Sequence, residues 1–283
     1  MRVRRFADPA AFAARAEPYL VADEALHILP LGVIAGIVRQ PGHGGAAPYL
    51  ATVETAGAVV TVALITPPRN LILARVAAPG ALDALIADLL DTDIRPPGVQ
   101  GPVPCSRGFA ARWCARTGQT ARRAMAQRIY RLDHVIPPVG VPGELRPLAA
   151  AERDLAVAWA GAFIAEAEDN PDPRAATNMV AQRLDSPLGG LALWWHDGRP
   201  VTLVGYAGPT PNGIRIGPVY TPPADRRRGY ATAATAALSQ HLLDNGRRWV
   251  ALFTDLANPT SNHIYQAIGY RAVGDVDDYR FAP

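Results

Sequence analysis

The chain has 283 residues, which is enough for two domains of roughly 140 residues each. Hydrophobic residues make up 49% and charged residues 19%, a balance that indicates a globular protein and excludes a disordered chain. The formal net charge is only +3, and the basic side chains are all arginine. The arginine clusters are short, unlike the basic face of a nucleic-acid-binding protein, so we expect no nucleic-acid partner. Abundant Arg, Ala, Pro and Gly are typical of a GC-rich bacterial genome.

The sequence shows no segment for membrane insertion or secretion. Its longest apolar stretch, residues 25–38, is interrupted by His27 and Pro30 and is shorter than the roughly 20 residues of a bilayer span. No charged start, apolar run and small-residue cleavage site opens the chain. We therefore expect a cytoplasmic protein with no membrane partner.

The cysteines and histidines do not form a metal-ligand pattern. Cys105 and Cys114 are too few for a disulfide framework or a four-ligand zinc site, and no two histidines have metal-ligand spacing. The sequence therefore predicts no metal, and we interpret both cysteines as small buried residues.

Residues 134–143, with the sequence HVIPPVGVPG, mark the clearest boundary in the chain. Proline and glycine hold such a segment extended and prevent it from continuing a helix. We predict an N-terminal domain at 1–134, a linker at 135–142 and a C-terminal domain at 143–283.

The N-terminal half is expected to mix helices and strands. Helices are predicted near 9–16, 24–38, 80–90 and 106–116, and strands near 48–55, 58–65, 70–76, 98–102 and 121–132.

The C-terminal half shows a similar order with clearer turn and capping signals. Asp197-Gly198 predicts a hairpin turn, Gly246 a helix end, and Asn258 before Pro259 a helix start. Strands are predicted at 143–147, 190–195, 200–207, 213–220, 249–253 and 270–281, and helices at 150–166, 173–185, 228–245 and 259–269. The predicted fold class is α/β (α+β), with two domains related by duplication, each a mixed, largely antiparallel sheet flanked by helices.

The segment GPVYTPPADRRRGYA, residues 217–231, has the character of an anion-binding loop. A strand ends, a proline-stiffened turn follows, and Arg226-x-x-Gly229-x-Ala231 opens a helix. The first turn of a helix has unpaired N–H groups and a partial positive charge, which suit phosphate oxygens. Gly229 and Ala231 keep the backbone accessible, and the arginines add charge-assisted hydrogen bonds. The alternative is a solvated basic turn before a surface helix.

A second motif, Asn258-Pro-Thr-Ser-Asn-His-Ile-Tyr-Gln-Ala-Ile-Gly-Tyr270, follows the next predicted strand. Together the two motifs resemble those of the GNAT superfamily of acyl-CoA-dependent N-acyltransferases, over about residues 143–283. The chain is most similar to a bacterial subfamily with a degenerate GNAT-like N-terminal half, so each domain is expected to be GNAT-like. The matching residues are Arg226, Gly229 and Ala231 in the first motif, and Asn258, Ser261, Ile264, Tyr265, Gly269 and Tyr270 in the second.

The resemblance implies that acetyl-CoA binds as co-substrate between the strand ending at Thr221 and the strand ending near Asp255. Backbone groups of the first strand would pair with the pantetheine arm, and one N–H there would stabilise the developing oxyanion. Asn258 would cap its helix, contact the pantetheine, or do both. The expected coenzyme-binding residues are Val219, Tyr220, Thr221, Arg226, Arg227, Arg228, Gly229, Tyr230, Ala231 and Asn258.

The resemblance also implies direct attack by a neutral amine, without an acyl-enzyme. Tyr265 would give its proton to the departing thiolate as general acid, and its alternative role is core packing. The general base stays open, because Arg215 stands where several GNAT enzymes have a glutamate. The candidates are Asp255, Glu166, Glu168 and Asp169; a water chain, or an amine already partly neutral, is the alternative.

The N-terminal half contains a similar segment, TPPRN at 66–70, but no Arg-x-x-Gly-x-Ala follows it. We interpret this half as a domain that kept the fold, lost the coenzyme site, and shapes the acceptor pocket or forms a pseudo-dimer with the other half. Two functions are consistent with the sequence: an N-acetyltransferase acting on a small-molecule or peptide amine, and a non-catalytic acyl-CoA-binding sensor or scaffold. The protein is expected to be a monomer or a homodimer.

Overall fold

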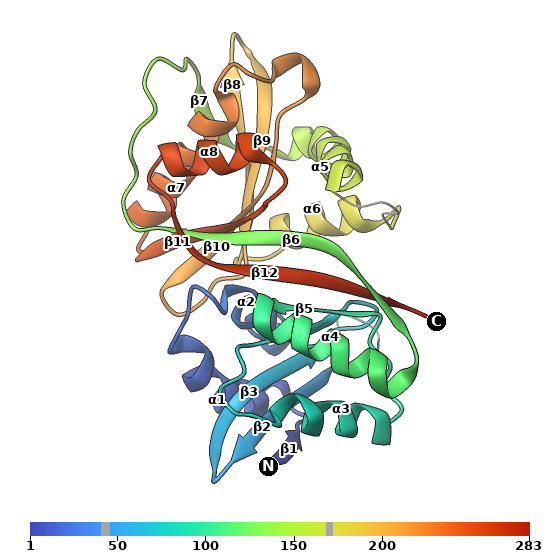
Figure 1. Cartoon of the computed structure of the whole chain (residues 1–283). Helices are drawn as coiled ribbons and strands as arrows, with labels where there is room; N and C mark the ends of the chain where they lie inside the picture. Colours follow the sequence, from blue (N-terminus) through green and yellow to red (C-terminus); the bar gives the residue numbers. More distant parts are fainter. Residues whose placement is uncertain (41–45, 168–171) are drawn as a thin grey trace. The chain divides into compact units, whose positions relative to one another are not determined.

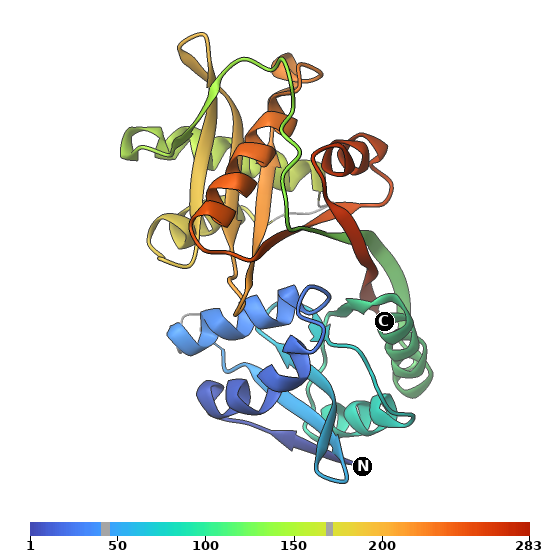
Figure 2. The same ribbon diagram turned by 90° about the vertical axis from the view of Figure 1, so that its left-hand side faces the viewer.

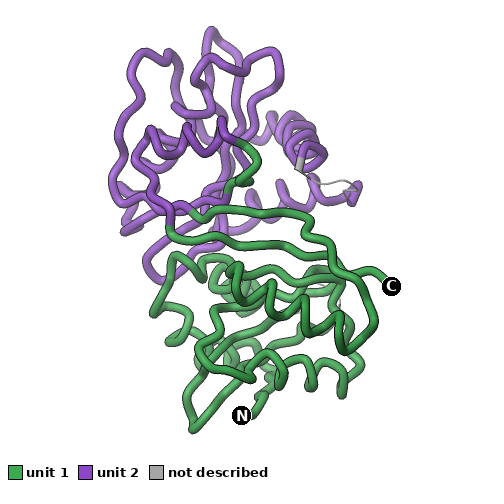
Figure 3. Tube along the Cα trace, viewed as in Figure 1, with its two compact units in different colours: residues 1–129, 254–258, 273–283 green, residues 130–253, 259–272 purple. Residues whose placement is uncertain are grey.

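A computed structural model describes residues 1–40, 46–167 and 172–283 of the chain (Figures 1 and 2). It forms two compact units, shown in different colours in Figure 3. The first unit contains residues 1–129, 254–258 and 273–283, and the second contains residues 130–253 and 259–272.

The two halves of the chain repeat one order of elements: strand, two helices, three strands, helix, strand, helix, strand. The first half contains β1 (Arg2–Arg5), α1 (Pro9–Val21), α2 (Ile28–Arg39), β2 (Tyr49–Thr55), β3 (Ala58–Ile65), β4 (Leu71–Leu73), α3 (Ala81–Asp91), β5 (Gly98–Pro102), α4 (Val103–Thr117) and β6 (Thr120–Leu132). The second half contains β7 (Glu144–Pro147), α5 (Arg153–Ala167), α6 (Ala175–Leu184), β8 (Gly190–His196), β9 (Arg199–Ala207), β10 (Gly213–Tyr220), α7 (Tyr230–Asp244), β11 (Trp249–Asp255), α8 (Pro259–Ala267) and β12 (Arg271–Ala282). Short 3-10 turns at Ala150–Glu152 and Pro223–Asp225 precede α5 and α7.

The sheet of the first unit has the order β1-β2-β3-β4-β5-β12. Its pairs are antiparallel except β4–β5. Side chains alternate across it as strand geometry requires. Leu50, Val62 and Leu64 pack with α1 and α2, whereas Ala51 and Ala63 pack with α3 and α4 on the opposite face.

The sheet of the second unit contains β7-β8-β9-β10-β11 in that order, antiparallel except for the β10–β11 pair. Helices α5 and α6 cover one face through an apolar cluster that includes Leu193 and Leu203. Helix α7 packs on the other face with Ile214 and Ile216; it is the orange helix in front of the yellow strands in Figure 2.

Most predicted elements are confirmed, and so is the mixed α/β architecture. Asp197 and Gly198 both have positive φ, at +49° and +72°, as the β8–β9 hairpin turn requires. Strand β1 was not predicted, because four residues containing three arginines give no apolar pattern. None of the helices in the described ranges is long and apolar enough to cross a membrane.

The boundaries of the compact units differ from the predicted domains in two ways. The C-terminal strand β12 pairs with β5 from Val276–Pro102 to Arg280–Gly98, so residues 273–283 belong to the first unit, as do residues 254–258. The predicted linker is part of the second unit: Val135 is 4% exposed within its core. The chain therefore passes from the first unit to the second near residue 129, and the second unit is completed without the final strand.

Candidate functional site

The site is organised by strand β10 and the point where its partner leaves it. The parallel β10–β11 ladder covers only three pairs and ends at Arg215 and Ala251. A β-bulge between Ile216 and Val219 follows on the β9 side, after which Val219 and Tyr220 again pair with β9. Beyond Arg215, β10 therefore has one edge bonded to β9 and one edge that β11 does not cover.

The loop after β10 is fixed by an ion pair whose carboxylate is buried. Asp225 is 5% exposed, and the Arg199 guanidinium donates two hydrogen bonds to its carboxylate, at 2.8 and 2.6 Å. These bonds hold the pKa of Asp225 below its ordinary value. Thr221 is joined to Thr202 of β9 by an Oγ1–Oγ1 hydrogen bond of 2.8 Å. Two contacts to β9 thus hold the loop at both ends.

Gly229, directly before α7, has φ +83°, in the left-handed region that favours glycine. A Cβ atom there would lie 2.8 Å from Cγ2 of Val141, which comes from the connector before β7. Among the described residues we find no acceptor for the N–H groups of residues 227–232. Such a helix start is suited to phosphate oxygens.

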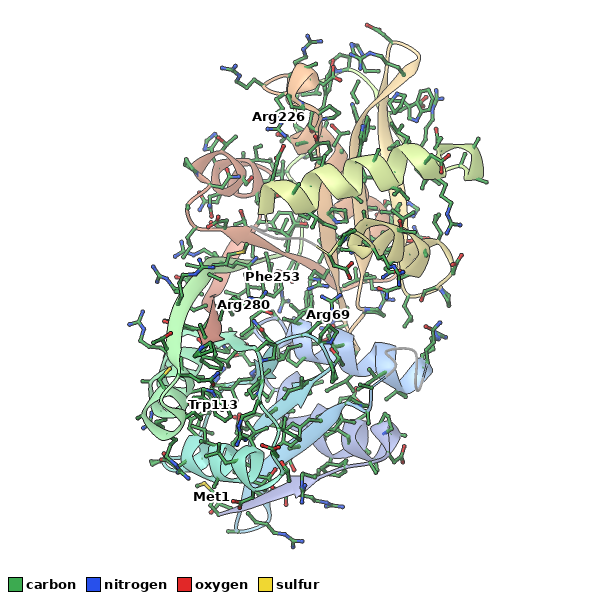
Figure 4. The ribbon with its side chains drawn as sticks, turned by 90° about the vertical axis from the view of Figure 1, so that its right-hand side faces the viewer. Met1, Arg69, Trp113, Arg226, Phe253 and Arg280 are labelled. Carbon is green, nitrogen blue, oxygen red and sulfur yellow. The ribbon has the colours of Figure 1, made fainter. Side chains whose placement is uncertain are left out.

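The three arginines of the loop differ in their contacts. Arg226, labelled in Figure 4, donates to the Thr221 carbonyl at 2.8 Å and to Glu166 Oε1 at 2.5 Å, and its guanidinium lies over the Tyr220 ring. Arg227 has φ +62°, and both it and Arg228 are exposed. Glu166, one of the proposed bases, thus lies beside the loop as the ion-pair partner of Arg226.

Tyr265 lies on α8 in the core of the second unit and is 9% exposed. Its ring packs edge-on against Tyr270, with centroids 5.9 Å apart. The Tyr270 hydroxyl is hydrogen-bonded to Ser239 at 2.9 Å, whereas the Tyr265 hydroxyl bonds to none of the described residues. Burial raises the pKa of Tyr265 to about 12, so the phenol keeps its proton at neutral pH.

The remaining predicted site residues lie outside the loop between β10 and α7. Asp255 and Asn258 belong to the segment 254–258, which groups with the first unit. There Asp255 Oδ1 accepts the N–H of Ala257 at 2.9 Å, and the Asn258 N–H donates to the Asp255 carbonyl at 3.1 Å. Glu168 and Asp169 lie outside the described residues.

The first unit has a different junction in the corresponding place. Residues 66–70 lie between β3 and β4, so they do not correspond to residues 221–226, and that comparison was wrong. The counterpart is the segment from β4 to α3, where Gly80 has φ +78° but no arginine cluster precedes it. The end of this segment borders a hollow of about 390 Å³. Cys105 also lines the hollow, and burial raises the pKa of its thiol.

Sequence reasoning missed Arg199, Asp225 and Arg183. Arg199 and Asp225 are 26 positions apart and meet because antiparallel pairing of β9 with β10 places the start of β9 beside the loop that follows β10. Arg183 lies in the last turn of the amphipathic helix α6, and no local sequence pattern distinguishes it from arginines that are exposed to solvent. Among the described residues no group of three His, Cys, Asp or Glu side chains could hold a metal ion.

Comparison with known proteins gives a match to a family model over part of the chain and a set of solved structures with the same fold. Residues 198–280 match the family model described as FR47-like protein. A GNAT-family acetyltransferase from Colwellia psychrerythraea has a TM-score of 0.61 at 12% identity, with both chains fully covered. A GCN5-related N-acetyltransferase from Sphaerobacter thermophilus has a TM-score of 0.61 at 18% identity, covering 99% of this chain and 94% of that one. A tandem GNAT protein from the clavulanic acid biosynthesis pathway has a TM-score of 0.63 at 15% identity, covering 99% and 98%. No curated protein matches this sequence.

The family model, the fold and the two motifs agree. The chain therefore has the fold of GNAT-family acetyltransferases, and part of its second half matches the FR47-like family model. The match to the tandem GNAT protein extends over nearly the whole chain, in agreement with the repeated order of elements in its two halves.

The Arg199–Asp225 pair should stabilise this protein in a pH-dependent way. In Arg199→Gln the buried carboxylate loses its charged partner, which should lower the free energy of unfolding at pH 7 by more than the loss of an exposed ion pair does. Because the pKa of Asp225 is lowered by folding, the pair's contribution is present above the unfolded pKa of ~3.9 and is lost as the pH falls through the folded pKa. Urea denaturation at pH 7 and pH 3 measures both effects.

The matched control is Glu144→Gln, which breaks the exposed Arg146–Glu144 pair of the same unit. An exposed pair contributes about 0–1 kcal/mol, so this variant should remain close to the parent. Equal, small effects of the two substitutions would show that Asp225 does not depend on Arg199.

Proposed function

We propose that this protein is an N-acetyltransferase that transfers an acetyl group from acetyl-CoA to a primary amine by direct attack in a ternary complex. The observation that carries the proposal is the start of α7: unpaired N–H groups, Gly229 in the left-handed region, and Arg226 to Arg228 beside them. The alternative, a non-catalytic acyl-CoA-binding sensor or scaffold, is supported by Arg215 in the place of a glutamate.

The residues present suit coenzyme A. Phosphate oxygens would accept hydrogen bonds from the N–H groups of Gly229, Tyr230 and Ala231, and Arg227 and Arg228 are exposed to supply positive charge. The edge of β10 that β11 leaves uncovered, from Val219 to Thr221, offers backbone groups to the amides of the pantetheine arm. Asn258 is the further proposed contact.

Acetyl-CoA supplies the acetyl group as a thioester. In the proposed reaction a C–N bond forms, the C–S bond breaks, one amine proton leaves, and the thiolate sulfur gains a proton. The Tyr265 phenol, protonated and not bonded to any described residue, is suited to give that proton. The proposed acceptors for the amine proton are Asp255 and Glu166. Glu166 would first have to leave Arg226, or act while paired to it.

The central test is release of free coenzyme A thiol from acetyl-CoA across a panel of primary amines. We expect release with a subset of amines, and acetylated amine as the second product. Reactions without amine serve as blanks, because the protein carries two thiols of its own. Binding of acetyl-CoA without thiol release for any amine would replace the proposed function by the sensor function.

Gly229→Ala should weaken acetyl-CoA binding at least tenfold in isothermal titration. The added methyl group would meet Val141 at 2.8 Å and force the helix start to move. Gly246→Ala is the control, because it places a similar left-handed strain of about 1–2 kcal/mol at the other end of α7 with no atom within 4 Å of the new Cβ. We expect unchanged affinity in the control. Parent-like affinity in Gly229→Ala would contradict the assignment of the phosphate site.

Tyr265→Phe should lower kcat and kcat/KM at least tenfold, since general-acid assistance typically contributes ~10²–10⁴-fold. Stability and acetyl-CoA affinity should change little, because no hydrogen bond to a described residue is lost.

Tyr270→Phe provides the opposite control. It removes the hydroxyl bonded to Ser239 and should cost about 1 kcal/mol of stability while turnover is kept. A Tyr265→Phe variant that works at the parent rate would show that this ring only packs.

A further inference from the structure

Arg183, in the last turn of α6, makes an unusual set of contacts. Its guanidinium donates to the carbonyl of Gly217, in the β10 bulge, at 2.9 Å and to the Met179 carbonyl of its own helix at 3.2 Å. Its Nε is fully buried and has no hydrogen-bond partner. No carboxylate of the described residues forms an ion pair with it.

This arrangement is energetically unfavourable without a further partner. A buried donor without an acceptor destabilises the folded state, and more so when it belongs to a charged group. The guanidinium has five N–H donors, of which two are used by the carbonyls. The side chain therefore keeps donor capacity, and its positive charge forms no ion pair with the described residues of the second unit.

A second arginine lies on the same side of the sheet. Ile214 and Ile216 point to the α7 face, so Arg215 between them points to the face covered by α5 and α6, from which Arg183 comes. Its guanidinium carbon lies 5.8 Å from the centre of the Phe253 ring, on the neighbouring strand. Phe253 is labelled in Figure 4. Burial and the charge of Arg215 together lower the pKa of Arg183 to about 10.

Both arginines lie at the level where the two central strands separate. Arg215 is the last β10 residue paired with β11, and Arg183 is bonded to Gly217, two residues further along. The next residues, Val219 to Thr221, are those proposed to hold the pantetheine. The two positive charges thus lie on the α5–α6 face of the sheet. Along β10 they precede the residues that are proposed to bind the pantetheine arm.

We propose that Arg183, together with Arg215, forms a subsite for a carboxylate group of the substrate. The planar guanidinium fork keeps N–H groups that the two carbonyls do not use and that suit carboxylate oxygens, and an anion beside them would balance the partly buried charge. The carboxylate belongs to the amine acceptor, as in an amino acid, or to the acyl chain of the coenzyme A thioester. This inference rests on the proposed acetyl-transfer function and specifies its substrate class.

The test compares compounds that differ only in this carboxylate. Alanine, β-alanine and 4-aminobutyrate are each paired with the corresponding amide, and acetyl-CoA is paired with succinyl-CoA. Binding to the full chain is measured by isothermal titration, with coenzyme A present for the acceptors, and turnover is measured by thiol release. The parent should favour the carboxylate member of at least one pair by roughly 10- to 100-fold. The pair that responds identifies the source of the carboxylate.

Arg183→Met should remove this preference and leave the amide or acetyl member within about threefold of the parent. Arg183→Lys keeps the charge without the fork and should give an intermediate preference. Arg174→Met, an exposed arginine at the start of the same helix, is the control and should behave like the parent.

Two results would overturn the proposal. One is a parent protein that binds no carboxylate compound better than its amide or acetyl partner. The other is an Arg183→Met variant that weakens both members of each pair equally, as expected if Arg183 only holds the Gly217 carbonyl. Because the comparison is made in binding, it remains decisive if no amine supports thiol release, a result that would remove only the proposed function.

Discussion

The structure of the second unit depends on the early end of one parallel ladder. After three pairs β11 no longer bonds to β10, and the bulge between Ile216 and Val219 redirects the rest of the strand. A strand edge left without a partner normally invites pairing with another chain. Here the open edge leads into a fixed loop and a helix start, and its backbone groups are those of the proposed coenzyme site. The β4–β5 ladder of the first unit covers only two pairs, yet the loop after β4 has no arginine cluster. Both halves therefore have a short parallel ladder, whereas only the second half has an arginine cluster in the loop that follows.

That chemistry is held in place by contacts from outside the motif. Arg199 fixes Asp225 from the β8–β9 hairpin, and Val141 lies against Gly229 from the connector. Both contacts come from residues of the protein itself, so they restrict the conformations open to the helix start. Such a restriction reduces the entropy that is lost when a loop is fixed on binding. Substitutions in β9 or in the connector should consequently act on the loop as strongly as substitutions within it.

Local signals account for what the sequence could predict. Asp197-Gly198, Gly246 and Pro259 fix turns and helix ends through their own backbone preferences, and the predicted elements at these positions are confirmed. The pairing of β12 with β5 could not be predicted, because strand partners far apart in the chain are chosen by the whole sheet and leave no mark in either segment. The same holds for Arg199 with Asp225. The two motifs predict the proposed coenzyme site. The general base could not be predicted, because its identity depends on which carboxylate lies near the amine, and that depends on how the loops are placed.

Asp225 and Arg183 differ in how their charges are balanced within the second unit. Asp225 is buried with a guanidinium that donates two hydrogen bonds, so its charge is neutralised within the protein. Arg183 is bonded only to two carbonyl oxygens and lies near a second positive charge. Carbonyl dipoles offset part of the desolvation of a guanidinium but carry no net charge to balance it. If the role of Arg183 were to hold the β10 bulge, a neutral donor such as an amide side chain would do so without burying a charge. A permanent cation at this position is therefore better explained by an anion that arrives with the substrate.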